Sequence, residues 1–159
     1  MESVTKIENS AFWGCVNLKT IRGYAVSYVE SYAKEYGYIF EDVEGKITTS
    51  YRTHVQSFGW QNPVTNGAMS GTSGEAKRLE AIQIKLYGEM ANHFDVYYRV
   101  HAQSYGWLGW AKNGEEAGTA GLAKRLEGIQ IVLIPKGGAA PANNYKNIQS
   151  VNTKAYIKK

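Results

Sequence analysis

The sequence has little cysteine, no long apolar run and no concentrated charge, and each shortage excludes a class of protein. A single cysteine, Cys15, stands among 159 residues, so no internal disulfide and no cysteine-based metal site can form. No apolar stretch approaches the roughly 18 residues that a membrane-spanning helix needs, so we expect no membrane insertion. The net charge is only +4, with basic residues spread along the chain. This pattern argues against nucleic-acid binding.

The chain also lacks a recognisable catalytic or metal-binding set. Its three histidines are His54, His93 and His101, and none has the spacing of a metal ligand pair. No nucleophile, general base and oxyanion donors can be recognised together. We therefore expect no enzymatic activity, no metal and no cofactor.

What the chain does contain is an internal repeat. Residues 51–86 match residues 98–133 without a gap at an offset of 47 residues, and 21 of the 36 aligned positions are identical. A fixed period of this kind is the signature of a repeat architecture, so the two copies are expected to fold alike.

Each copy predicts two strands separated by a turn-rich segment. Residues 51–56 and 98–103 alternate with a period of two, which is typical of a half-buried strand. Residues 78–86 and 125–133 predict the second strands, and Asn-Gly pairs with closely spaced glycines lie between. The repeat is therefore expected to be all-β. The core is expected from one face of the second strands: Ile82, Ile84, Leu86, Ile129, Ile131 and Leu133.

The polar face of each first strand is a candidate binding surface because it is identical in the two copies. It consists of Arg52, His54 and Gln56 in one copy and Arg99, His101 and Gln103 in the other. Imidazole and amide groups suit hydrogen bonding to sugar hydroxyls. The alternatives are a solvated face or cross-strand hydrogen bonds. Arg78 with Glu80, and Arg125 with Glu127, are expected to be structural ion pairs.

A Gly-Trp pair follows in each copy, at Trp60 and Trp107. A half-exposed tryptophan can stack on a sugar ring, whereas the alternative is a buried anchor. Trp110 occurs only in the second copy, where the first has Pro63, and it is expected to be the most exposed of the three. The predicted ligand-binding residues are Trp60, Trp107, Trp110, His54, Gln56, His101, Gln103 and Tyr105.

This composite motif resembles the clostridial hydrophobic repeat with a marked tryptophan, called ChW. The motif comprises Tyr51, His54-Val55-Gln56, Gly59-Trp60, Asn66-Gly67, Gly71-Thr72-Ser73-Gly74 and Arg78–Leu86, with their counterparts in the second copy. The resemblance implies a secreted or cell-surface protein of Gram-positive anaerobes, with roles in adhesion or polysaccharide binding.

The N-terminal segment has a different pattern. Its apolar string is Ile7, Ala11, Phe12, Cys15, Leu18 and Ile21. This string resembles one repeat of the BspA-like leucine-rich class, which implies that Cys15 is a small buried residue. A capping-box spacing from Ser27 to Glu30 predicts a helix ending at Gly37, followed by a strand over 38–40. Because a lone repeat cannot bury its own core, we expect further repeats and an export signal upstream of Met1.

Together these patterns predict a mainly β chain with three parts. Residues 1–43 are a small α/β leucine-rich cap, residues 44–137 hold two repeats (about 45–88 and 92–135), and residues 138–159 are a tail or a degenerate third repeat. Repeats sharing one core suggest a prism-like or trefoil-like pseudo-repeat domain. The expected function is glycan recognition for surface attachment, the alternatives being a protein-binding adhesin or a structural spacer. The oligomeric state stays open.

Overall fold

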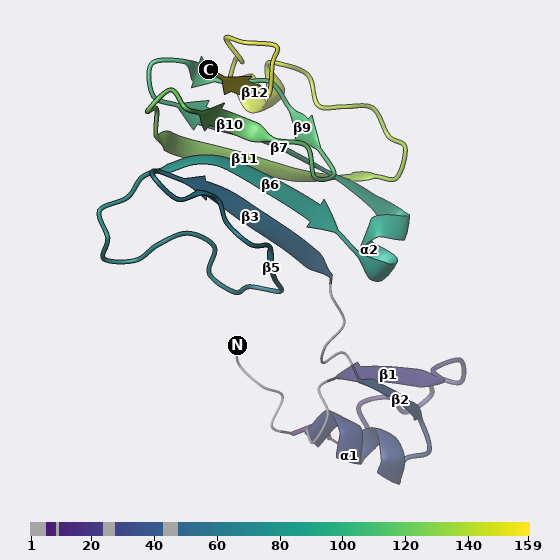
Figure 1. Ribbon diagram of the computed structural model, residues 1–159. Coiled ribbons are helices and arrows are strands. Elements are labelled where there is room, and N and C mark those ends of the chain that lie inside the picture. The colour runs from purple at the N-terminus through teal and green to yellow at the C-terminus, as the bar shows by residue number, and fades with distance from the viewer. Residues whose placement is uncertain (1–5, 9, 24–27, 43–47) are drawn as a thin grey trace. The chain divides into compact units, whose positions relative to one another are not determined.

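The protein is described by a computed structural model at residues 6–8, 10–23, 28–42 and 48–159. The chain divides into two compact units, residues 1–46 and 47–159 (Figure 1). Strands take up 38% and helices 12%, which confirms the prediction of a mainly β protein. The prism-like or trefoil-like arrangement stays a prediction.

The first unit combines β1 (Thr20–Gly23), α1 (Tyr28–Glu35) and β2 (Ile39–Asp42), with β1 and β2 paired in parallel. The helix ends as predicted, because Gly37 has a φ of +75° and the Tyr38 amide donates to the Ala33 carbonyl at 2.8 Å. Ser27, the expected capping residue, lies outside the described residues. A small core gathers several residues of the N-terminal string: Ile7, Phe12, Leu18 and Ile21, with Tyr32 and Ala33 of α1.

The expectation that Cys15 is buried is wrong. Cys15 is exposed and lies in a tight turn, where its amide donates to the Phe12 carbonyl at 3.0 Å. Its side chain lines an open aromatic hollow with Trp13, Tyr32 and Tyr36. The thiol is thus not enclosed within the first unit, as a neighbouring coil would enclose it in a solenoid.

The second unit contains both repeats. The first repeat forms β3 (Thr49–Val55), β4 (Gly59–Trp60), β5 (Val64–Thr65) and β6 (Leu79–Leu86). The second forms β7 (Phe94–Ala102), β8 (Gly106–Trp107), β9 (Ala111–Lys112), β10 (Ala117–Ala120) and β11 (Leu126–Pro135). The short helix α2 (Gly88–His93), which the sequence did not predict, connects them. The tail adds a 3-10 turn, η1 (Tyr145–Asn147), and β12 (Tyr156–Lys158).

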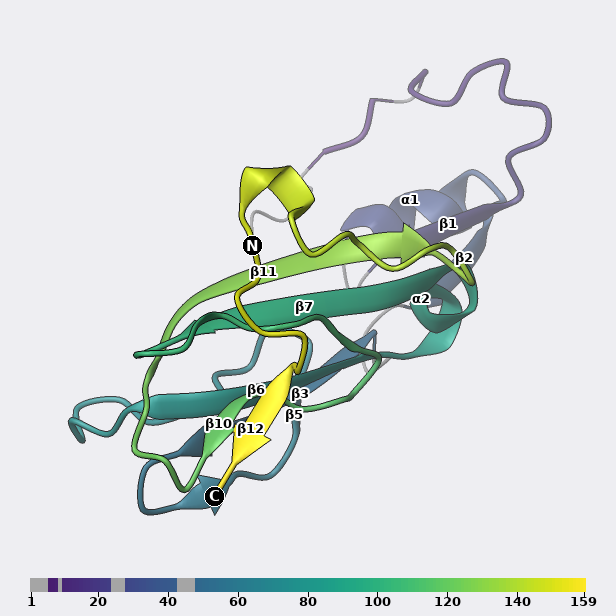
Figure 2. The same ribbon diagram turned by 90° about the horizontal axis from the view of Figure 1, so that it is seen from above.

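The two repeats interlock through one strand. The first sheet has the order β12-β10-β6-β3-β4, with β5 also on β3, and the second has the order β11-β7-β8, with β9 also on β7. Strand β10 comes from the second repeat but pairs antiparallel with β6 of the first, Ala117 opposite Ile82. Figure 2 shows β7 and β11 running side by side. The sheet of the first repeat is therefore extended by a strand of the second repeat.

A shared core lies between the two sheets. Its buried residues are Ile84 and Leu86 of β6, Val96, Tyr98, Val100 and Ala102 of β7, Leu108, Ala111 and Ala117. The expected contribution of β6 is thus confirmed for Ile84 and Leu86, with Ile82 packed at the margin. The matching expectation for β11 is wrong, because Ile129, Ile131 and Leu133 are 40%, 55% and 42% exposed. Strand β11 lies at the edge of its sheet, and β7 takes the central place.

The Asn-Gly turns form as predicted. Asn66 and Gly67 have φ values of +49° and +90°, and Asn113 and Gly114 have +47° and +100°. Two successive positive φ angles are the geometry of a tight hairpin turn. Each asparagine also ties the turn to the start of the long strand, since Oδ1 of Asn113 accepts from the Val96 amide at 2.9 Å.

Candidate functional site

An arginine and a histidine pack on the marked tryptophan of the first repeat. The Arg52 guanidinium lies over the Trp60 ring at 5.1 Å, and the His54 ring meets Trp60 edge-on at 5.5 Å. These contacts follow from the hairpin of β3 and β4, which sets His54 opposite Trp60. The tryptophan is half-buried, so a cation and an imidazole already occupy part of its surface.

The second repeat reproduces this arrangement closely. Arg99 lies over the Trp107 ring at 5.3 Å, and His101 meets Trp107 edge-on at 5.6 Å. The predicted residues Arg, His and Trp are therefore brought together in both repeats. Both tryptophans pack on a histidine of their hairpin and stay half-buried, and their stacking on a sugar ring stays a prediction.

A glutamate completes each cluster, and its contact with the histidine was not predicted from the sequence. Nδ1 of His54 lies 3.2 Å from Oε2 of buried Glu80, and Nε of Arg78 lies 2.8 Å from Oε1 of Glu80. In the second repeat, Glu127 lies 3.2 Å from Nδ1 of His101 and 2.8 Å from the Arg125 guanidinium. Both predicted ion pairs, of Arg78 with Glu80 and of Arg125 with Glu127, are confirmed.

An open hollow of about 480 Å³ lies beside the first cluster. It is lined by His54, Gln56, Ser57, Gly59, Arg78 and Glu80, with Gly121 and Ala123 of the second repeat. Two predicted site residues, His54 and Gln56, thus line the same hollow. Its rim offers an amide, a hydroxyl, a guanidinium and a carboxylate, which can donate and accept hydrogen bonds.

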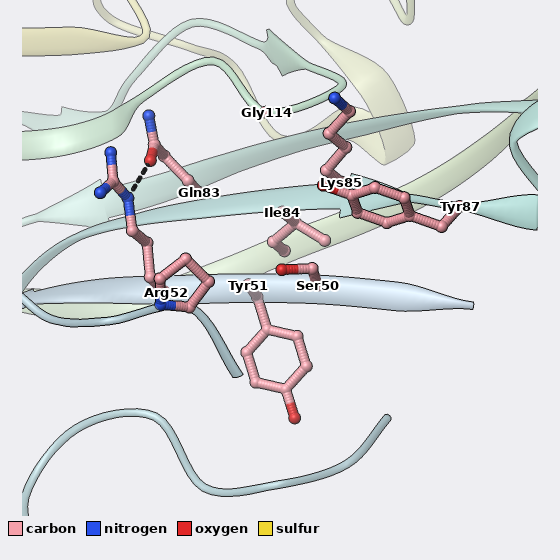
Figure 3. Close-up of a pocket in the computed structure, with 9 residues that line it drawn as sticks. Ser50, Tyr51, Arg52, Gln83, Ile84, Lys85, Tyr87 and Gly114 are labelled. Carbon is pink, nitrogen blue, oxygen red and sulfur yellow. Dashed lines mark hydrogen bonds between the residues drawn. The ribbon is translucent and has the colours of Figure 1, made fainter. Parts of the chain in front are cut away.

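A second hollow, of about 200 Å³, is lined in part by Arg52. Nε of Arg52 donates to Oε1 of Gln83 on β6 (Figure 3). Ser50, Lys85 and Tyr87 also line this hollow, together with Tyr51, Pro63, Ile84 and Gly114. The Arg52 guanidinium packs on the Trp60 ring and also lines this hollow.

The equivalent arginine of the second repeat is enclosed by the C-terminal tail. Arg99 has 0% exposure, and its Nε donates to Oε1 of Gln130 at 2.7 Å, as Arg52 donates to Gln83. Its other nitrogens donate to the tail: the carbonyls of Asn143 at 2.8 Å, Ile148 at 2.7 Å and Tyr145 at 3.3 Å, and the Ser150 hydroxyl. Burial lowers the pKa of the Arg99 guanidinium from its usual value. Each arginine and its glutamine partner form what we call the arginine fork, Arg52 with Gln83 and Arg99 with Gln130. This fork borders an open hollow in the first repeat and is occupied by the tail in the second.

The remaining predicted residues have other surroundings. Trp110, expected to be the most exposed of the three repeat tryptophans, is half-buried like Trp60 and Trp107. Arg99 lies over its ring at 4.6 Å, and its indole nitrogen donates to the Ala142 carbonyl at 3.2 Å. Tyr105 packs against the shared core. Gln103 is half-buried, and its backbone N–H donates to the Arg125 carbonyl at 2.9 Å.

One buried charged residue, Asp95, was not predicted from the sequence. Asp95 is 2% exposed and accepts from Lys112 at 2.9 Å, Lys136 at 3.0 Å, the Asn113 side chain at 2.7 Å and the Gly137 amide at 3.1 Å. These partners, with Lys112 first, hold the pKa of the Asp95 carboxyl well below its usual range. The cluster fastens the second repeat to the start of the tail. Within the described ranges, no group of three or more histidine, cysteine or acidic residues could hold a metal ion.

Comparison with known families identifies the repeats. Residues 54–88 and 101–135 match the family model ChW, described as clostridial hydrophobic W. The chain therefore contains two ChW repeats, as the motif predicted, and such repeats are found in cell-surface proteins of clostridia. No curated protein and no solved structure gives a significant match. None of the helices in the described part of the chain is long and apolar enough to cross a membrane.

Proposed function

We propose that this chain is a non-catalytic binding module of a secreted or cell-surface bacterial protein, and that it recognises glycan at the hollow beside His54. The ChW repeats support the cell-surface setting. The observation that carries the proposal is the convergence of His54, Gln56 and Ser57 with the Arg78–Glu80 pair around one hollow. Sugars present hydroxyls that both donate and accept, and these side chains offer both kinds of partner.

The open shape of the hollow supports a proposal about the mode of binding. The hollow is open, and a shallow site with a few polar side chains holds a short saccharide weakly. Weak sites become effective when several act on one polymeric ligand. A polysaccharide is therefore a better fit than a small sugar, because one chain can engage several copies of the module on a cell surface.

The test is binding to an array of peptidoglycan fragments, bacterial polysaccharides and mucin-type glycans. The His54→Ala and Gln56→Ala variants should lose at least tenfold in affinity, which corresponds to about 1.4 kcal/mol. His93→Ala is the matched control, because His93 is exposed at the end of α2, outside the hollow. Trp60→Ala asks whether the ring contributes as a platform. Folded variants that keep full binding, or folded wild-type protein that binds no glycan, would refute the proposal.

A second candidate, recognition of a protein partner, is favoured by the surroundings of Arg99. There the arginine fork holds three main-chain carbonyls of the tail, and the fork of Arg52 and Gln83 has the same residues beside an open hollow. A peptide covering residues 141–152 is a suitable probe. It should bind wild-type protein better than Arg52→Met, with Lys77→Met as a control that removes a cation from the same repeat. Equal binding to all three proteins would count against this candidate.

We propose further that the first unit is a leucine-rich coil closed by a helical cap. The support is the packing of Ile7, Phe12, Leu18 and Ile21 on α1. A Phe12→Ser variant should unfold this unit alone. Loss of the near-UV signal of residues 47–159 in the same variant would argue against a separate cap.

A further inference from the structure

Strand β11 has an unpaired edge. It is ten residues long and pairs with β7 alone among the described strands. Protein edges usually carry a lysine, a proline or a bulge that prevents pairing with another strand. Here a bulge lies near Leu126 and a proline at position 135, whereas the stretch from Gly128 to Ile134 has no charged residue. The middle of the edge is therefore open to an added strand.

The same strand carries an uncovered apolar stripe, Ile129, Ile131 and Leu133, which are 40%, 55% and 42% exposed. The equivalent residues Ile84 and Leu86 of β6 are only 8% and 6% exposed, because the second repeat covers them. The apolar stripe is thus buried in the first repeat, where the second repeat covers it, and exposed in the second repeat. A free apolar edge of this kind is a pairing site.

The first repeat of another copy does not suit this stripe. It has Thr49, Thr53, Gln61 and Ser70 where the second repeat has the buried residues Val96, Val100, Leu108 and Ala117. Head-to-tail stacking would therefore set polar groups against the apolar stripe, and burying them without partners costs free energy. The stripe itself, in contrast, is self-complementary.

We propose that two copies of this chain associate through β11, paired antiparallel about a twofold axis at Ile131. Ile131 then faces Ile131 of the second copy, and Ile129 faces Leu133 of the second copy. Apolar cross-strand pairs of this kind stabilise a sheet. Glu127 falls opposite Pro135, so no like charges meet. The interface is isologous and closes at two copies.

Pairing along β11 leaves the hollow beside His54 outside the strand pairs, since none of its lining residues belongs to β11. The dimer would present two such hollows. The proposal does not depend on glycan binding, and its tests involve no ligand.

The first test is the mass of the full chain by sedimentation velocity over a range of concentrations. Wild-type protein should form dimers, and Ile131→Lys should raise the dissociation constant at least tenfold. Val151→Lys is the matched control, because Val151 is an exposed apolar residue of the tail. A wild-type protein that stays monomeric at every concentration overturns the proposal. So does an Ile131→Lys variant that dimerises like wild type.

The register is tested by cross-linking in a Cys15→Ser background, which removes the chain's own thiol. Ile131→Cys should form a disulfide dimer on oxidation, because residues on the axis face each other. Ile129→Cys should not, since the two copies of position 129 would lie about 13 Å apart, at roughly 3.3 Å for each of four residues. A disulfide needs Cα atoms within about 7 Å. Ile129→Cys mixed with Leu133→Cys should cross-link, and efficient cross-linking of Ile129→Cys alone would overturn the register.

Discussion

Replacing Arg99 with methionine should destabilise the second unit far more than the same change at Arg52. The two arginines are equivalent in the repeat and make the same contacts with a glutamine and a tryptophan. Arg99 alone adds three carbonyls and a hydroxyl of the tail. The difference between the two variants therefore measures the attachment of the tail.

The expected loss of stability in Arg99→Met follows from the hydrogen-bond acceptors that the substitution leaves without a donor. A hydrogen bond to a charged group contributes about 1.5–3 kcal/mol, and an acceptor left buried without a partner adds a penalty. Methionine preserves much of the stem volume but no donor, and water can reach some of the tail carbonyls. We expect Arg99→Met to cost about 3–5 kcal/mol, because several hydrogen bonds to a charged group are lost together and water restores part of them. Half-buried Arg52 should cost about 1 kcal/mol or less.

The assay is urea unfolding followed by tryptophan fluorescence, since Trp107 and Trp110 both contact Arg99. In a thermal melt of a unit of this size, a loss of 3–5 kcal/mol in unfolding free energy should lower Tm by roughly 10–20 °C. Proteolysis should also cut the tail of Arg99→Met sooner than that of Arg52→Met. Equal losses of stability in the two variants, or a loss below about 1 kcal/mol at Arg99, would refute the reasoning.

Two further predictions concern the interlocked repeats. Because its partners lower the pKa of Asp95, the cluster should stabilise the fold at pH values above the usual carboxyl pKa of about 4, and this stabilisation should be lost as the pH falls further. Asp95→Asn should thus be less stable than wild type at pH 7. If the difference in urea midpoint between wild type and Asp95→Asn did not narrow at pH 3, the prediction would be contradicted. A Cβ at Gly118 would lie 2.4 Å from the Glu80 carbonyl oxygen, whereas one at Gly71 would meet only side chains, the nearest at 3.2 Å. Since both residues have positive φ, Gly118→Ala should cost about 2 kcal/mol more than Gly71→Ala, and calorimetry showing equal Tm values would argue against the close approach of β10 to β6.

The local features of the fold could be predicted from the sequence. The period of two gave the long strands, and the Asn-Gly pairs gave turns in which both residues have positive φ. Arg78 and Glu80 are two residues apart at the start of β6, so their pairing needs no tertiary information. These features depend on neighbours along the chain, and a single sequence contains them.

Features that depend on which elements meet could not be predicted. The alternating pattern assigned the same apolar face to β6 and β11, but only β6 has a neighbouring repeat over it. The pairing of β10 with β6 exchanges a strand between repeats, and no local pattern marks an exchange. The enclosure of Arg99 by the tail joins positions 44 to 51 residues apart. A small signal did exist for this contact, since Trp110 replaces Pro63 only in the copy whose arginine is enclosed.

The two repeats separate what the fold requires from what binding can use. The tryptophan, arginine, histidine and glutamate of the cluster are the same in both copies and pack in the same way, so their mutual contacts belong to the fold. The two clusters differ in the chain segment that contacts them from outside the repeat. The tail closes the fork in the second repeat, whereas the first leaves both its fork and the hollow beside His54 open. Because the first repeat leaves both its arginine and this hollow accessible, it is the place to look for a ligand.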